Sequence, residues 1–100
     1  MTKSLSETVQ ILQMYQAELQ RRGVAHVAVF GSVARDEAGE DSDIDILVEL
    51  DPSRPIGLFA YGNLKLYINT LLGGGADVVN RKTLKPHLRD TITRDAVDAF

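Results

Sequence analysis

The sequence predicts a small α/β layer fold, and two observations carry the prediction. Three short runs at 24–30, 44–50 and 76–80 are rich in valine, isoleucine and leucine and have the length of strands. Longer amphipathic segments lie before, between and after these runs, so the element order is α-β-α-β-α-β-α. Strands that alternate with helices favour one sheet covered by helices.

Length and composition fit one globular domain over residues 1–100. The chain is 44% hydrophobic and 25% charged, which is ordinary usage for a folded protein. No apolar run is long enough to span a bilayer, and no cysteine is present, which excludes disulfides and suits a reducing cytoplasm. A net charge of -3 argues against direct nucleic-acid binding. We therefore expect a cytoplasmic protein without membrane contact.

The first predicted element is one amphipathic helix over residues 4–22. Ser4 and Glu7 have the spacing of a capping box, in which each side chain accepts from the backbone of the other. Gly23 stands where a helix of this length would end. This helix is expected to cover the sheet.

The first two strands are expected at 24–30 and 44–50, with a short helix between them. The first strand is closed by Gly31-Ser32, and the helix is expected to begin at Val33 and to give way around Gly39.

The second half of the chain is expected to hold two helices and one strand. Two prolines place residues 51–55 in a loop, and a helix over 57–72 ends at the triple glycine 73–75. The third strand, 76–80, precedes a last helix over 83–100. That helix carries apolar residues at i, i+4 spacing, namely Leu84, Leu88, Ile92 and Ala96. The helix over 57–72 has a second apolar stripe, formed by Phe59, Leu66 and Tyr67.

Chemically distinctive residues stand where these strands begin or end. Gly31-Ser32 follows the first strand at a helix start, where free backbone N–H groups can bind phosphate. Asp43 and Asp45 are two residues apart, so both carboxylates face the same way, and Mg²⁺ would relieve their repulsion. Asp77 begins the third strand. Each feature alone is more often turn chemistry or a solvated acid.

One topology brings these features together. Gly31-Ser32 meets Asp43 and Asp45 if strands one and two are antiparallel, and Asp77 joins them if strands two and three are parallel neighbours. The segment 51–75 is a crossover of suitable length and contains a helix, as parallel pairing requires. The result is a mixed three-stranded sheet with a phosphate-binding turn and three carboxylates at one edge, the parts of a two-metal site.

The spacing of these residues resembles that of a known superfamily. Gly31-Ser32, ten intervening residues and then Asp43-Ile44-Asp45 match the Gly-Ser-x10-Asp-x-Asp signature of polymerase-β-like nucleotidyltransferases. The stretch GSVARDEAGEDSDIDILVEL, followed by ADVVNRKTLKP, is similar to the minimal (MNT) branch, the antitoxin partners of HEPN-domain toxins. The resemblance covers nearly the whole chain.

The resemblance implies a role for each site residue. Gly31 and Ser32 would hold a nucleoside triphosphate, with Arg35 near the phosphates or paired with an acid. Asp43 and Asp45 would ligate two Mg²⁺ ions. Asp77 would ligate the catalytic metal and help to deprotonate the attacking hydroxyl. One departure is Asp36, where many relatives carry glycine, so the local turn is expected to differ.

The implied reaction is Mg²⁺-dependent transfer of AMP from ATP to a hydroxyl. This chain is too short to hold a template-binding domain, so another molecule must bring the acceptor. The resemblance implies that the acceptor is a tyrosine of a HEPN-family RNase toxin, and that the transfer neutralises the toxin. Two alternatives remain. One is steric neutralisation of the toxin through the second apolar stripe, a surface that also suits a homo-oligomer or a hetero-oligomer with the toxin. The other is nucleotidyl transfer to RNA. A response-regulator-like phosphoacceptor fits less well, because it needs its acid at the carboxyl end of a parallel strand.

Overall fold

The computed structural model describes residues 4–37 and 43–100 as alternating helices and strands. The helices are α1 (Leu5–Met14), α2 (Gln16–Arg21), α3 (Gly31–Ala34), α4 (Leu58–Leu71) and α5 (Pro86–Asp95), with a 3₁₀ turn, η1, at Arg81–Thr83. The strands are β1 (Val24–Phe30), β2 (Ile44–Leu50), β3 (Ala76–Asn80) and β4 (Val97–Asp98). No helix in the described ranges has both the length and the apolar character needed to cross a membrane.

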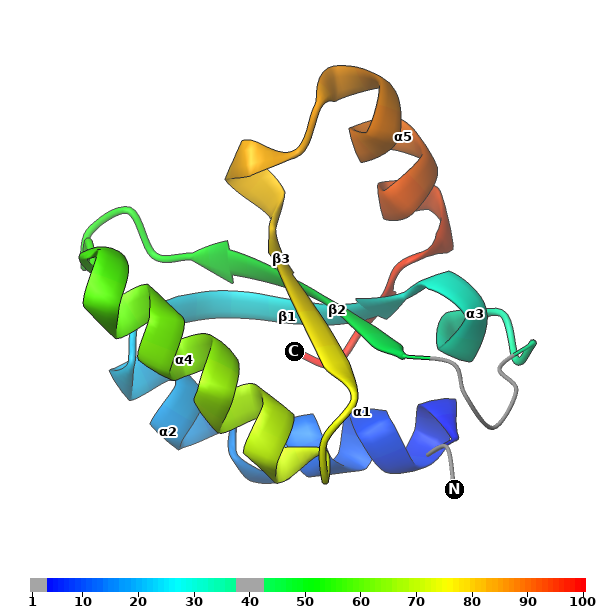
Figure 1. Ribbon diagram of the computed structural model, residues 1–100, viewed down its shortest axis with the longest axis horizontal. Coiled ribbons are helices and arrows are strands. Elements are labelled where there is room, and N and C mark those ends of the chain that lie inside the picture. The colour runs from blue at the N-terminus through cyan, green and yellow to red at the C-terminus, as the bar shows by residue number, and fades with distance from the viewer. Residues whose placement is uncertain (1–3, 38–42) are drawn as a thin grey trace.

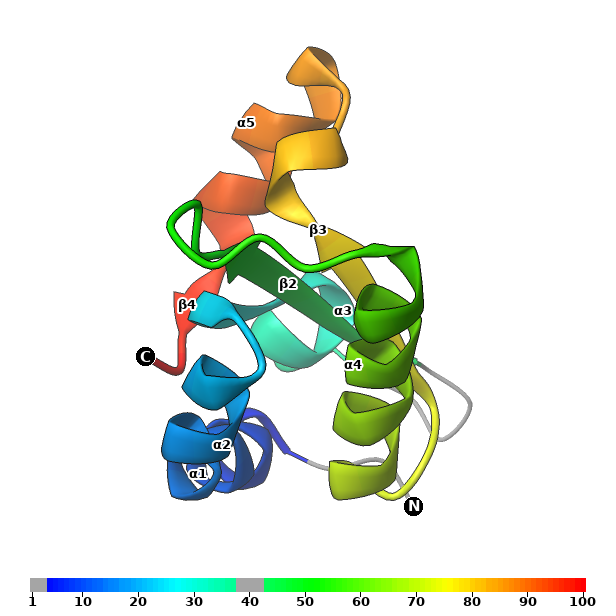
Figure 2. The ribbon, with the colours of Figure 1, turned by 90° about the vertical axis from the view of Figure 1, so that its left-hand side faces the viewer.

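The strands form one mixed sheet in the order β3-β2-β1-β4. Figure 1 labels β1, β2 and β3, and Figure 2 labels β4. β1 and β2 are antiparallel, and β2 and β3 are parallel, so both predicted pairings are confirmed. The sheet has a fourth strand that the sequence analysis does not predict. β4 pairs antiparallel with β1 through Ala28 and Val29 and so covers the edge of β1.

The two faces of the sheet are covered unequally. The helices α1, α2 and α4 pack under one face, while α5 stands on the other side (Figures 1 and 2). α5 contains no buried residue. One face therefore carries the core, and the other, called the open face below, is only partly covered by α5.

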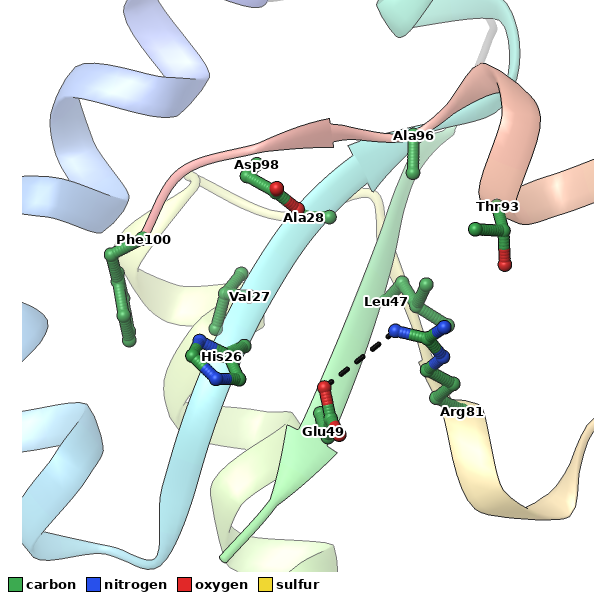
Figure 3. Close-up of a pocket in the computed structure, with 10 residues that line it drawn as sticks. All are labelled: His26, Val27, Ala28, Leu47, Glu49, Arg81, Thr93, Ala96, Asp98 and Phe100. Atoms are coloured by element: carbon green, nitrogen blue, oxygen red, sulfur yellow. Dashed lines mark ion pairs between the residues drawn. The ribbon is translucent and has the colours of Figure 1, made fainter.

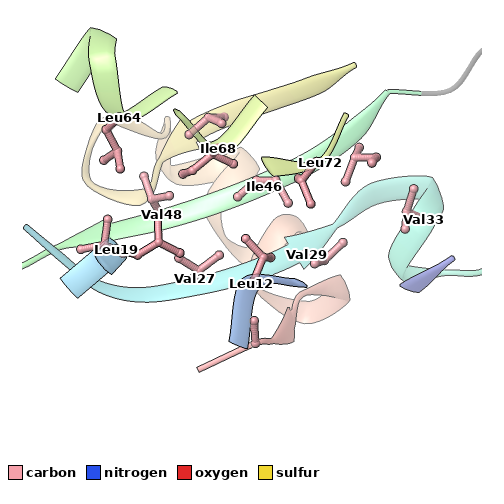
Figure 4. Close-up of a cluster of buried hydrophobic side chains, with 14 residues drawn as sticks. Leu12, Leu19, Val27, Val29, Val33, Ile46, Val48, Leu64, Ile68 and Leu72 are labelled. Carbon is pink, nitrogen blue, oxygen red and sulfur yellow. The ribbon is translucent and has the colours of Figure 1, made fainter. Parts of the chain in front are cut away.

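The hydrophobic core lies between the sheet and the α1, α2 and α4 helices (Figure 4). Alternate strand residues point into it because successive side chains of a strand face opposite sides. Among the described residues, the hydrophobic side chains with no exposed surface are Leu12, Leu19, Val27, Val29, Ile46, Val48 and Ile68. These buried residues fix which strand positions remain on the open face.

The predicted N-terminal helix is interrupted at Tyr15. This residue has φ -103° and ψ 18°, which ends α1 and starts α2 in a new direction. The capping box is confirmed: Glu7 N donates to Ser4 Oγ at 3.1 Å, and Ser4 N donates to Glu7 Oε1 at 3.4 Å. Gly23 follows α2 with φ +100°, as expected for a residue that ends a helix.

The predicted last helix, 83–100, is too long, because α5 ends at Asp95. Beyond Ala96 the chain is extended and pairs with β1. Ala99 is buried, and its carbonyl oxygen accepts a hydrogen bond from Gln13 Nε2 at 2.9 Å. Pairing with the edge of β1 and contact with α1 thus outweigh the helical spacing of the apolar residues.

Candidate active site

The register of the sheet places two of the predicted acids side by side. Asp45 on β2 pairs directly with Asp77 on β3, so their backbones are about 4.8 Å apart, the spacing of neighbouring strands. Their neighbours Ile46 and Val78 are buried in the core. By alternation both carboxylates therefore stand on the open face.

Asp43 lies just before β2 and is exposed. The backbone N–H of the neighbouring residue, Ile44, donates to Gly75 O at 2.8 Å. This hydrogen bond holds the first residue of β2 beside the residue that precedes β3. Asp43 is two residues before Asp45, so the predicted acids all lie at the edge where β2 and β3 begin.

Gly31 brings the end of β1 against Asp45. Its φ is +76°, a left-handed conformation that glycine adopts at little cost. A Cβ built at this position would overlap Asp45 Oδ2 and would lie 3.1 Å from Asp45 Cγ. Since Phe30 pairs with Asp45, the backbone of the predicted phosphate-binding turn packs on the carboxylate. The missing side chain at residue 31 is what permits this contact.

The charges at this edge repel one another. Burial raises the pKa of Asp45 above its ordinary value, and the negative charges of Asp77 and Asp43 raise it further, whereas Arg35 lowers it. Three carboxylates near one another are a hard-oxygen donor set of the kind that Mg²⁺ prefers. Within residues 4–37 and 43–100, no three His, Asp or Glu side chains converge closely enough to surround an ion in their present rotamers. The donor types therefore fit Mg²⁺, and binding would require the carboxylates to turn toward a common point.

Arg35 is paired with acids, as one of the two expectations for it states. Its Nη1 lies 2.9 Å from Asp95 Oδ2, and its Nε lies 3.1 Å from Glu37 Oε2. Hydrogen bonds to Glu37 and Asp95 raise the pKa of the guanidinium. The pair with Asp95 joins the end of α3 to the end of α5.

The short helix after β1 begins two residues earlier than predicted. The helix α3 begins at Gly31 rather than at Val33, and Arg35 is already its C-cap. Asp36 has φ +58°, so an aspartate here takes the left-handed conformation that glycine would adopt more easily. The predicted end of the helix at Gly39 lies outside the described residues.

Asp95 is the contact that the sequence reasoning missed. It is 60 residues from Arg35 along the chain. It lies in a segment in which the sequence pattern marks only the apolar face of the helix. Only the return of α5 over the open face of the sheet brings the two side chains together. A pattern of local spacing carries no signal for such a contact.

The sequence pattern of the family described as nucleotidyltransferase domain matches residues 12–99. This chain belongs to the nucleotidyltransferase domain family. The matched range includes the Gly31-Ser32 turn and all three acids described above, so the predicted family is confirmed.

Individual nucleotidyltransferases resemble the chain over most of its length. A protein adenylyltransferase, MntA, of Thermococcus cleftensis is 40% identical over 97 residues, covering 94% of each chain. A solved structure described as a minimal nucleotidyltransferase superposes with a TM-score of 0.79 at 38% identity and covers 95% of both chains. The minimal size and the strand arrangement of this nucleotidyltransferase therefore recur in a second structure.

A toxin–antitoxin complex contains the same fold. The matched chain belongs to a structure of a tri-AMPylated HEPN toxin of Shewanella oneidensis in complex with its MNT antitoxin. The TM-score is 0.63 at 17% identity, covering 92% of this chain and 71% of that chain. At this identity the likeness supports the fold alone.

Proposed function

We propose that this nucleotidyltransferase is a Mg²⁺-dependent protein adenylyltransferase that acts as an antitoxin. It would transfer AMP from ATP to a hydroxyl, most simply a tyrosine, of a HEPN-family RNase toxin and so neutralise it. The observation that carries the proposal is the direct pairing of Asp45 with Asp77 beside the Gly31 turn. The 40% identity to an adenylyltransferase over most of the chain supports the substrate class.

The reaction exchanges one phosphorus–oxygen bond for another. The acceptor oxygen forms a bond to the α-phosphorus of ATP, the bond from that phosphorus to the bridging oxygen breaks, and pyrophosphate leaves with the electron pair. The proton of the acceptor hydroxyl passes to the exposed carboxylate of Asp77. The reaction needs no reactant besides ATP and the acceptor hydroxyl.

Backbone and side chains around the turn would hold the triphosphate. Gly31 leaves room for phosphate oxygens to approach the main chain, and the Ser32 hydroxyl adds a donor. Arg35 ends the same short helix and supplies a positive charge near the carboxylates. These groups would orient the α-phosphorus toward an acceptor beside Asp77.

Asp43, Asp45 and Asp77 would hold the metal. When bound, Mg²⁺ would neutralise the phosphate charge and the charge of the carboxylates themselves. Asp45 is the ligand expected to matter most, since it pairs with Asp77, follows Asp43 by two residues and lies against the Gly31 turn.

Label transfer tests the proposal. The protein is incubated with α-³²P-labelled ATP, Mg²⁺ and a HEPN-family protein, under conditions in which the two proteins bind. We expect label on the HEPN protein with the wild type, loss of at least a hundredfold in Asp45→Asn and Asp77→Asn, and no change in Asp90→Asn. Asp90 is an exposed acid on α5 and serves as the matched control. Binding without any label transfer by the wild type would overturn the enzymatic proposal, and label on added RNA instead would redirect it to an RNA acceptor.

A steric antitoxin is the second candidate, favoured by the outer surface of α4. Phe59 is 88% exposed and Leu66 is 65% exposed, so this apolar surface is uncovered in the single chain. Under this alternative, Phe59→Glu and Leu66→Glu would abolish neutralisation of toxin RNase activity, while Asp45→Asn would leave it intact. Asn63→Glu, an exposed position on the same helix, controls for the added charge.

A further inference from the structure

A cavity lies on the open face of the sheet beneath α5 (Figure 3). Its volume is about 550 Å³, within the range of small-molecule sites. Ala28 and Leu47, which pair across β1 and β2, form its floor. Thr93 and Ala96, from α5 and its C-cap, line it from above the sheet. The small side chain of Ala28 keeps the floor low.

The cavity shares its face with the acids. Asp45, Leu47 and Glu49 alternate along β2 and therefore point to the same side. At about 3.3 Å per residue, the floor begins roughly 7 Å from Asp45 and the rim at Glu49 lies roughly 13 Å away. On β1, Ala28 stands three residues before Gly31. A molecule with its phosphates at the Gly31 turn can thus extend over this floor.

The lining combines an apolar floor with a polar rim. Arg81 Nη1 lies 3.7 Å from Glu49 Oε2 at one side, and His26 and Asp98 stand at the other (Figure 3). A flat aromatic ring with donors and acceptors on its edge is the chemistry that such a lining accommodates. Nucleobases have this character.

The strand order separates this cavity from the acceptor side. The sheet runs β3-β2-β1-β4, and the cavity floor lies on β1 and β2 with β4 at its border. The phosphate-binding turn continues β1, whereas Asp77, the proposed proton acceptor, lies on β3, which is separated from β1 by β2. A nucleotide therefore fits the β1 half of the open face, and the acceptor hydroxyl approaches from the β3 half.

We infer that the cavity beneath α5 is the nucleoside subsite of the enzyme, and this inference rests on the proposed nucleotidyl transfer. The ring of the base lies on Ala28 and Leu47, and α5 closes over it. The ion pair between Arg35 and Asp95 ties α5 to the phosphate-binding turn. The groups that hold the phosphates and those that cover the base are thereby linked.

Two probes separate base recognition from phosphate recognition. One is a non-hydrolysable ATP analogue and the other is inorganic tripolyphosphate, each titrated calorimetrically with Mg²⁺ present. Ala28→Leu fills the floor and is expected to weaken analogue binding at least tenfold, with the affinity for tripolyphosphate unchanged within twofold. Ala17→Leu, an exposed position on α2 under the other face, should alter neither affinity.

A second variant guards against misfolding of the first. Thr93 is exposed on α5, so Thr93→Phe adds bulk at the upper wall of the cavity without loss of packing and should give the same selective loss. Equal loss of both probes in both variants would overturn the inference, as would analogue binding that neither variant changes. If the wild type binds both probes with the same affinity, the subsite is wrong while nucleotidyl transfer stands. If the wild type binds neither, the proposed function fails and the subsite with it.

Discussion

Substitution of Gly31 by alanine tests the contact on which the site is built. Two separate costs are expected. The left-handed backbone, with φ +76°, costs an L-residue about 1–2 kcal/mol. Overpacking of the new methyl group against the Asp45 carboxylate adds about 1–3 kcal/mol. The free energy of unfolding should therefore fall by about 2–5 kcal/mol.

Gly75→Ala separates the two costs. Gly75 has φ +73°, nearly the same backbone conformation, but a Cβ there would meet no atom within 4 Å. Only the backbone cost of about 1–2 kcal/mol then applies. The difference between the two variants, about 1–3 kcal/mol, measures the contact with Asp45.

Urea unfolding followed by circular dichroism gives both values, provided that the slope against denaturant is the same for all variants. In an Asp45→Ala background the carboxylate is gone, so Gly31→Ala should approach the cost of Gly75→Ala. Equal losses for Gly31→Ala and Gly75→Ala in the wild-type background would refute the reasoning, because Asp45 would then not pack on the turn. Strict additivity of Gly31→Ala and Asp45→Ala would refute it in the same way.

Three further predictions follow from packing, capping and the α5 ion pair. Leu64→Ala should lower the free energy of unfolding by about 2–5 kcal/mol, because Leu64 is 1% exposed, whereas Leu66→Ala, at 65% exposure, should change it by less than about 0.5 kcal/mol in the same urea assay. Ser4→Ala removes the acceptor of the α1 capping box and should cost about 1 kcal/mol by thermal unfolding; an unchanged melting temperature would contradict the cap. Asp95→Asn breaks the ion pair with Arg35 and should speed amide hydrogen exchange in α5 while exchange in β1 and β2 stays the same; equal exchange of α5 in both proteins would show that the pair does not hold this helix.

The three strands that carry the site were predictable from local sequence. Their bounds match the predicted runs because each is a short aliphatic segment flanked by glycine or a loop. The pairing directions followed from the requirement that the acids meet the Gly31 turn, and the segment 51–75 is long enough for the crossover that parallel pairing of β2 and β3 needs. Asp45 and Asp77 could be placed together for the same reason.

The remaining differences arise from tertiary contacts. Helical spacing continues through Ala96, but the unpaired edge of β1 captures residues 97–98, and no local pattern reports that edge. The Tyr15 break between α1 and α2 is equally invisible to a periodicity that continues on both sides of it. The cavity beneath α5 depends on where that helix stands, so it could not be predicted either.

The parallel pairing of β2 with β3 makes the acid pair an outcome of the hydrophobic core. A slip of one residue would turn Val78 out of the core and Asp77 into it, so an incorrect register is penalised by lost burial and by a buried charge. Mutations that leave the sheet folded must therefore also leave Asp45 opposite Asp77. Loss of activity in a folded variant should then trace to the carboxylates themselves, to the Gly31 turn or to the groups that receive the substrates.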